Sequence, residues 1–289
     1  LSRVSDQDLD EIIDDLMHCA LQDGHTETIK LLLDLGAKVN AKADGYDTSI
    51  LYYAAQYGYL EVVQLLLERG ADVNPKTKKG LPAAYYQAYL SGRDKGNSEL
   101  FQLLLSRGAN VSENNDYGKK LLEYAAESGD YAILKLLIEK KIDINALNST
   151  GHVALHWPAR YGFIKIIKLL LKHNAPICAQ DERGRGPLSV AAHRGRTETA
   201  KLLLERGADV NQQDKKGKSS LNYATRYGHS ETVKLLLEQG ANVHQQDNKG
   251  KSSLNYAAKY GYFEIVKLLL EWGANVTQGN NKGKPSLNY

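Results

Sequence analysis

The stretch Asp247–Gln278 reads DNKGKSSLNYAAKYGYFEIVKLLLEWGANVTQ and contains the signals of a turn followed by two helices. An aspartate starts the turn and Gly250 completes it, because glycine readily adopts a positive φ. Ser252 or Ser253 can cap the first helix, since a serine oxygen accepts a hydrogen bond from a free backbone N–H group. The Leu-rich run that follows predicts a second helix, and Gly273 ends it in the left-handed conformation typical of that position.

The same unit recurs along the chain. A glycine after a Leu-rich run stands at Gly36, Gly70, Gly108, Gly207, Gly240 and Gly273. Lys141 and Asn174 occupy the two missing slots, and from Gly108 onward the interval is always 33 residues. Such a period predicts stacked units, each made of a β-turn and two helices.

These units resemble the ankyrin-repeat family, whose pattern is roughly D-x-x-G-x-T-P-L-H-x-A-A-x-x-G. The family's proline is present at Pro187 and its histidine at His156. Asparagine takes the histidine slot three times, and its amide is expected to bridge the backbones of neighbouring turns. The asparagines are Asn222, Asn255 and Asn288; in other units Tyr52, Tyr85, Glu123 and Ser189 stand there, which puts the bridge in doubt.

The resemblance covers essentially the whole chain and implies an all-α ankyrin-repeat solenoid. We expect one domain, residues 1–289, with about eight repeats and the start of a ninth. The expected units are 5–42, 43–76, 77–114, 115–147, 148–180, 181–213, 214–246, 247–279 and the partial unit 280–289.

The two ends and one insertion depart from the regular unit. Ser5 is expected to cap a first helix whose outer face is polar, as in an end-capping repeat. Residues 89–95 are an insertion between the helices of the third unit. The chain begins without Met, and the apolar start of a ninth unit at its end predicts that the natural polypeptide continues beyond Tyr289.

Two irregularities fall close together between the fourth and fifth units. Lys141 must adopt the left-handed conformation that glycine adopts freely, at a cost on the order of 1 kcal/mol. Pro158 stands where alanine belongs in a first helix, and a proline inside a helix removes a hydrogen bond. The sequence therefore predicts a weak joint around Lys141 to Tyr161.

Two motifs resemble functional sites, a phosphate-binding loop and a metal site, but each lacks residues that such a site needs. Gly217 and Gly250 each begin a Gly-Lys-Ser tripeptide like the end of a phosphate-binding P-loop. A P-loop also needs a glycine five residues earlier, where Gln212 and Gln245 stand.

His152 and His156 have a metal-binding spacing, but the register places one in a turn and the other in the bridging slot, and no third ligand is evident. The sequence shows no Ser/His/Asp, Cys/His or carboxylate arrangement that would form a catalytic site. We therefore expect no enzyme activity, no cofactor and no metal.

In the ankyrin family, partners lie along the concave face, which is made of turn tips and the inner surface of the first helices. From the fifth unit onward, the matching slots hold thirteen basic residues, Lys282 and Lys284 included, and one acidic residue, Glu182. This gives a local charge of +12, against +3 for the whole chain. The predicted partner-binding residues are Tyr57, Trp157, Arg160, Tyr161, Arg183, Arg185, Arg194, Lys215, Lys216, Lys218, Tyr223, Arg226, Tyr227, Lys249, Lys251, Tyr256, Lys259 and Tyr260.

The leading hypothesis is a protein-binding scaffold that recognises an acidic or phosphorylated segment, because one sign of charge in a groove attracts the opposite sign. Single-stranded nucleic acid is the alternative, since basic groups are interleaved with aromatic rings. A third reading is the targeting module of a larger enzyme or effector.

Further expectations concern the state and location of the protein. No apolar run approaches the ~20 residues of a membrane span, so we expect no membrane insertion, and we expect a monomer. Two cysteines far apart in sequence fit a reducing, intracellular compartment. The composition resembles ankyrin proteins that intracellular bacteria deliver into host cells, and also those of protists.

Overall fold

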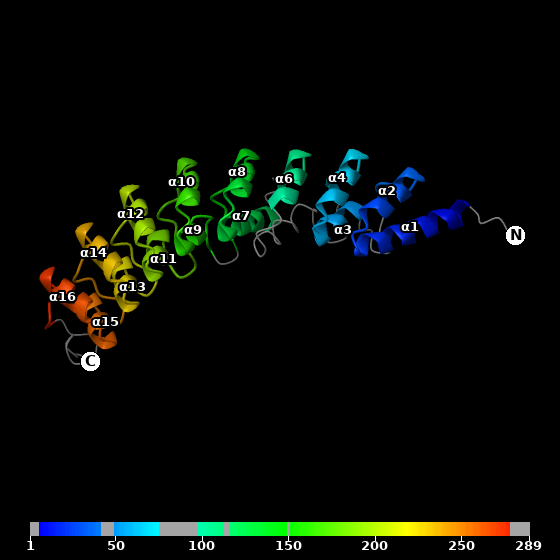
Figure 1. Ribbon diagram of the computed structural model, residues 1–289. Coiled ribbons are helices and arrows are strands. Elements are labelled where there is room, and N and C mark those ends of the chain that lie inside the picture. Colours follow the sequence, from blue (N-terminus) through cyan, green and yellow to red (C-terminus); the bar gives the residue numbers. More distant parts are fainter. Residues whose placement is uncertain (1–5, 42–48, 75–97, 112–115, 149–150, 278–289) are drawn as a thin grey trace. The chain divides into compact units, whose positions relative to one another are not determined.

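Paired helices joined by short loops make up the described part of the protein. The computed structural model describes residues 6–41, 49–74, 98–111, 116–148 and 151–277 (Figure 1). Several sequence expectations lie outside these residues: those for Ser5, Tyr85, 89–95, Lys282, Lys284 and the ninth unit at 280–289.

The chain divides into two compact units, Leu1–Asp143 and Ile144–Tyr289. This division lies close to the predicted repeat boundary after residue 147. The helices described in the N-terminal unit are α1 (Asp6–Gln22), α2 (Thr26–Asp34), α3 (Ile50–Tyr57), α4 (Leu60–Glu68), α6 (Ser98–Ser106), α7 (Asp116–Ser128) and α8 (Tyr131–Glu139).

Within this N-terminal unit, first helices pack on first helices and second helices on second helices. Helix α1 contacts α3, whereas α2, α4, α6 and α8 contact one another in that order. The expected repeat of two helix layers is confirmed in this unit.

In the described part of the C-terminal unit, four helix pairs repeat the same arrangement. They are α9 (His156–Tyr161), α10 (Ile164–Lys172), α11 (Pro187–His193), α12 (Thr197–Glu205), α13 (Ser220–Arg226), α14 (Ser230–Glu238), α15 (Ser253–Tyr260) and α16 (Phe263–Glu271). The first helices α9, α11, α13 and α15 form one layer, and the second helices α10, α12, α14 and α16 form the other (Figure 1).

Helix α13 shows why the sequence folds in this way. Ser219 caps it by accepting a hydrogen bond from the Asn222 N–H, and the Asn222 side chain accepts one from the Ser219 N–H. Leu221 and Ala224 lie fully buried between the layers. In the next repeat Ser252, rather than Ser253, is the cap of α15.

Residues in the histidine slot form hydrogen bonds to the next repeat. Histidine bonds to its backbone, as expected, whereas asparagine bonds to a side chain. His156 accepts a hydrogen bond from the Val153 N–H at 3.1 Å and donates one to the Arg185 carbonyl at 3.0 Å. The amide of Asn222 instead donates to the hydroxyl of Ser253 in the next repeat at 2.9 Å. The predicted backbone bridge is therefore wrong for this asparagine, because the serine hydroxyl lies in the path of its amide.

The two irregularities between the fourth and fifth units have different outcomes. Lys141 does adopt a positive φ of 60°. Pro158, however, does not break a helix, because α9 begins only at His156, two positions later than the matching start of α13. Proline is tolerated in a first turn, where N–H groups have no partner within the helix. The weak joint stays a prediction; the division between Asp143 and Ile144 falls inside its segment.

Candidate functional site: a basic groove in the C-terminal unit

A buried aspartate organises three of the turns in this unit. Asp214 is 8% exposed, and one of its carboxylate oxygens accepts hydrogen bonds from the Lys216 and Lys218 N–H groups, both at 2.8 Å. Asp181 and Asp247 make the same pair of bonds in their own turns, at 2.9 Å. The turn tips therefore have a fixed backbone, and this backbone positions their basic side chains.

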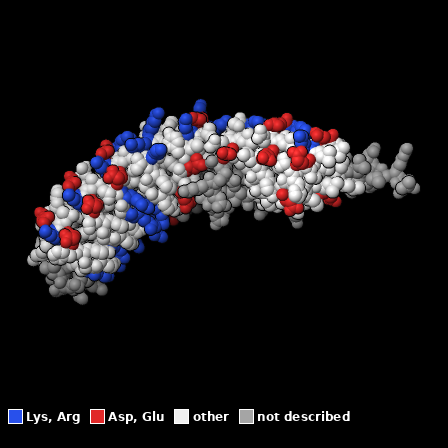
Figure 2. All heavy atoms as spheres, in the orientation of Figure 1, with Lys and Arg blue, Asp and Glu red and all other residues white. Residues whose placement is uncertain are grey.

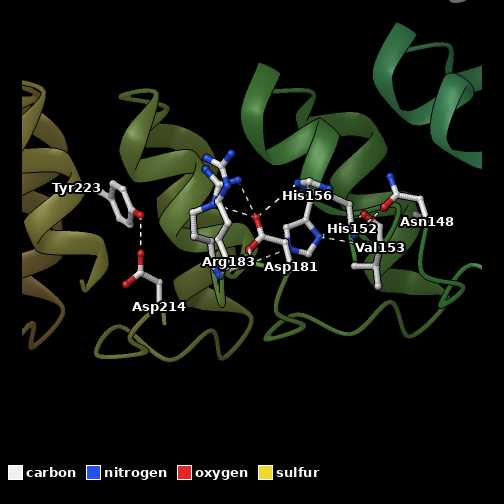
Figure 3. Close-up of polar contacts among 9 residues, drawn as sticks. Asn148, His152, Val153, His156, Asp181, Arg183, Asp214 and Tyr223 are labelled. Atoms are coloured by element: carbon white, nitrogen blue, oxygen red, sulfur yellow. Dashed lines mark hydrogen bonds and ion pairs between the residues drawn. The ribbon is translucent and has the colours of Figure 1, made fainter. Parts of the chain in front are cut away.

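A tyrosine holds the second oxygen of two of these aspartates. The Tyr223 hydroxyl donates to Asp214 at 2.6 Å (Figure 3), and Tyr256 donates to Asp247 in the same way. Burial, together with the hydrogen bond to Asp214, raises the pKa of the Tyr223 hydroxyl. Tyr223 and Tyr256 were predicted to contact a partner; the structure buries them and gives both a structural role.

In the third aspartate, Asp181, an arginine rather than a tyrosine contacts the second carboxylate oxygen. The Arg185 guanidinium contacts its second oxygen at 2.7 Å, and His152 lies 3.5 Å from the same oxygen (Figure 3). Burial alone would raise the pKa of Asp181, but the hydrogen bonds from Arg185 and Arg183 lower it below the usual value. Arg185, predicted to contact a partner, is thus held by an internal ion pair.

Adjacent turns are also bonded to one another. The Lys215 N–H donates to the Arg183 carbonyl at 3.0 Å, and the Asn248 N–H donates to the Lys216 carbonyl at 2.9 Å. Gly184, with φ of +78°, allows this approach, because a Cβ there would lie 2.6 Å from the Lys215 nitrogen. The basic tips therefore follow one another in a continuous row.

Two cavities lie along this row, with volumes of about 570 and 520 Å³. They adjoin, because Lys216, Lys218 and Arg226 line both. We call the two together the basic groove. Its lining residues are Glu182, Arg183, Arg185, His193, Asp214, Lys215, Lys216, Lys218, Tyr223, Arg226, Tyr227, Asp247, Asn248, Lys249, Lys251, Tyr256, Lys259 and Tyr260.

The groove is positive, although less so than the sequence predicts. Nine of its lining residues are Lys or Arg and three are Asp or Glu, a net charge of +6. The two counts cover different residues. The sequence count included Arg160 and Arg194, which do not line the groove, and Lys282 and Lys284, which lie outside the described residues. It also missed Asp214 and Asp247, because it considered only outward-facing slots. Figure 2 shows Lys and Arg gathered along one edge of the C-terminal unit, while basic and acidic atoms alternate along the other.

Cations and aromatic rings are interleaved in the groove. The Lys218 ammonium lies 5.6 and 5.8 Å from the ring centres of Tyr223 and Tyr256. Burial lowers the pKa of Lys218, and the neighbouring Arg226 lowers it further. The Arg226 guanidinium lies 5.9 Å from the ring centres of Tyr227 and Tyr260. A cation is attracted to the face of an aromatic ring, so these contacts hold the basic groups in place.

Five of the predicted binding residues do not line the groove. They are Tyr57, Trp157, Arg160, Tyr161 and Arg194. Tyr57 belongs to the N-terminal unit and stacks on Tyr53 and Tyr59. Trp157 stacks on Tyr161, with Arg160 over both rings, in the fifth repeat.

The groove wall also contains a histidine that was not among the predicted binding residues. His193 lies 4.3 Å from Tyr227, ring centre to ring centre. Burial, followed by the charges of Arg194 and Arg185, lowers the pKa of His193 to about 4. His193 is therefore neutral at pH 7 and adds no charge to the groove.

The Gly-Lys-Ser tripeptides lie at turns, whereas His156 lies in α9. The Lys218 N–H of one Gly-Lys-Ser tripeptide is bonded to Asp214, within a turn tip. In the residues that the structure describes, no group of three or more His, Cys, Asp or Glu could hold a metal ion. None of the helices described there is both long and apolar enough to cross a bilayer.

Comparison with known proteins identifies the repeat. A family model described as ankyrin repeats, three copies, matches residues 5–77, 88–181, 143–214 and 188–280. Comparison with curated proteins gives no match. Together the family matches cover most of the sequence. The chain therefore belongs to the ankyrin-repeat family.

Proposed function

We propose that the basic groove binds an acidic or phosphorylated segment of another protein. Ankyrin repeats imply a protein-interaction scaffold, they are typically non-catalytic, and only ankyrin repeats are detected in this chain. The observation that carries the finer proposal is the excess of nine basic over three acidic residues in two adjoining cavities. A cleft lined by one sign of charge concentrates ligands of the opposite sign.

The acidic residues of the groove do not cancel this attraction. Both carboxylate oxygens of Asp214 and of Asp247 accept hydrogen bonds within their own repeats. By contrast, Lys215, Lys216 and Lys249 are exposed and form no ion pair with any residue that the structure describes. An anionic ligand would meet available cations first.

Nucleic acid is the less favoured ligand. Base stacking needs an accessible ring face, but Tyr223 and Tyr256 are 8% and 3% exposed. Tyr227 and Tyr260 are more exposed, yet each already has a cation over its ring. The groove thus offers many charges and few free ring faces. An intracellular scaffold, or the targeting part of a larger enzyme or effector, would both use the groove in this way.

A titration separates these ligands. We expect fluorescent peptides rich in glutamate or phosphoserine to bind more tightly than single-stranded RNA of equal length. The association rate should fall about tenfold or more between 0.05 and 0.5 M salt, because exposed charges are screened. Stopped-flow fluorescence measures this rate.

Two results would count against the proposal. Tighter binding of the RNA would make the groove a nucleic-acid site. A rate that is flat across the salt series would indicate an apolar interface centred on tyrosine.

A further inference from the structure

We infer that the bound segment is a polyproline II helix with an anionic side chain at every third residue, an inference that rests on the proposed function. Two equivalent cavities, one repeat apart, carry it. Each is lined by turn lysines two and four residues after a buried aspartate, by a buried tyrosine nine residues after it, and by a basic–tyrosine pair at the end of a first helix. A ligand that fills both cavities meets the same chemistry twice.

The spacing between the equivalent positions follows from helix packing. Helix α13 packs between α11 and α15, and packed helices lie about 8–10 Å apart. The Lys218 ammonium lies within 6 Å of the ring centres of both Tyr223 and Tyr256. The separation of these two equivalent rings is therefore consistent with this spacing. A matching ligand must therefore repeat itself about every 9 Å.

Polyproline II has this repeat. It rises about 3.1 Å per residue with three residues per turn, so side chains three residues apart share a face about 9 Å apart. In a β-strand, side chains three residues apart point to opposite faces. An α-helix has a pitch of about 5.4 Å, so successive turns along one of its faces are too closely spaced to match a repeat of about 9 Å.

The ends of the first helices suit the same backbone. A polyproline II segment makes no internal hydrogen bonds, so its carbonyl groups are available to donors in the groove. Tyr227 and Tyr260, which are 44% and 39% exposed, mark this position once per repeat. Arg226 and Lys259, beside these rings, can donate to such carbonyls or to the anionic side chains.

Three peptides of one composition test the spacing. Each has four Glu and eight Pro: (Glu-Pro-Pro)₄, (Glu-Pro)₄-Pro₄ and Glu₂-Pro₃-Glu₂-Pro₅; only the first has glutamates three residues apart. All three favour polyproline II and have equal charge, so they differ only in the spacing of glutamate. By isothermal titration calorimetry, we expect (Glu-Pro-Pro)₄ to bind at least tenfold more tightly than the others. (Glu-Gly-Gly)₄ should bind more weakly, because it must lose more conformational freedom.

The outcomes separate this inference from the proposed function. Equal affinity for the three proline peptides overturns the three-residue spacing and leaves the proposed function standing. Equal affinity for the glycine peptide overturns the polyproline II backbone. Absence of binding by every peptide at low salt overturns both the inference and the proposed function.

Two protein variants test whether the groove recognises the spacing of the glutamates. Arg226 lines both cavities, so Arg226→Gln should reduce the preference for (Glu-Pro-Pro)₄ severalfold. Lys234→Gln, on the outer helix α14, should leave it unchanged. Circular dichroism checks that both variants are folded. An unchanged preference in folded Arg226→Gln would show that the spacing is not read in this groove.

Discussion

Replacement of Lys218, Arg226, Lys251 and Lys259 together by glutamate should weaken binding of an acidic segment at least a hundredfold. The four residues line the groove, whose net charge would change from +6 to −2. Attraction becomes repulsion, which lowers both the affinity and the association rate. A binding titration of the acidic peptide at low salt measures the effect.

This variant should also lose some stability. Lys218 and Arg226 are half-buried against tyrosine rings, so their replacement changes packing as well as charge. Loss of these cation–ring contacts should lower the free energy of unfolding by about 1–2 kcal/mol. The variant is therefore assayed at a temperature where circular dichroism shows it folded.

A matched control changes the same number of charges on the outer helices. It carries the exposed-site replacements Lys168→Glu, Lys201→Glu, Lys234→Glu and Lys267→Glu. These positions lie on α10, α12, α14 and α16, away from the residues that line the groove. If the control loses as much affinity as the groove variant, net charge rather than the groove governs binding.

Asp214→Ala should lower the free energy of unfolding by about 3 kcal/mol, since each buried donor left without a partner costs about 1–3 kcal/mol. The substitution removes the acceptor of the Lys216 N–H, the Lys218 N–H and the Tyr223 hydroxyl. Urea unfolding monitored by circular dichroism measures the change. Binding of an acidic peptide to the folded variant should persist, because the groove loses a negative charge.

Variants that each lose a single hydroxyl group provide a scale for the stability change of Asp214→Ala. Tyr223→Phe removes only the hydrogen bond to Asp214 and should cost about 1 kcal/mol. Tyr227→Phe, on an exposed ring, should change stability by less than about 0.5 kcal/mol. Equal stability of Asp214→Ala and the wild-type protein would mean that the buried aspartate does not organise the turn.

Much of the fold could be predicted because each unit repeats its signals. The 33-residue interval, the glycine ends and the serine caps all act locally, so they place the helix pairs and the turn tips without tertiary information. The basic tips were predictable for the same reason: Lys216 and Lys249 occupy equivalent slots in successive turns.

The roles of several side chains could not be predicted. The contact between Asp214 and Tyr223 spans nine residues and forms only when the turn folds over the start of α13. This contact depends on how the turn and the helix pack together, which a residue pattern does not show.

Zero-length carbodiimide cross-linking of an acidic peptide to lysine, followed by mass spectrometry, tests the central claim most directly. It joins a carboxylate only to an ammonium group that it touches, so it reports where the ligand lies. If the groove is the binding site, cross-links should concentrate on Lys215, Lys216, Lys249 and Lys251. Cross-links spread equally over the exposed outer-helix residues Lys201, Lys234 and Lys267 would contradict it.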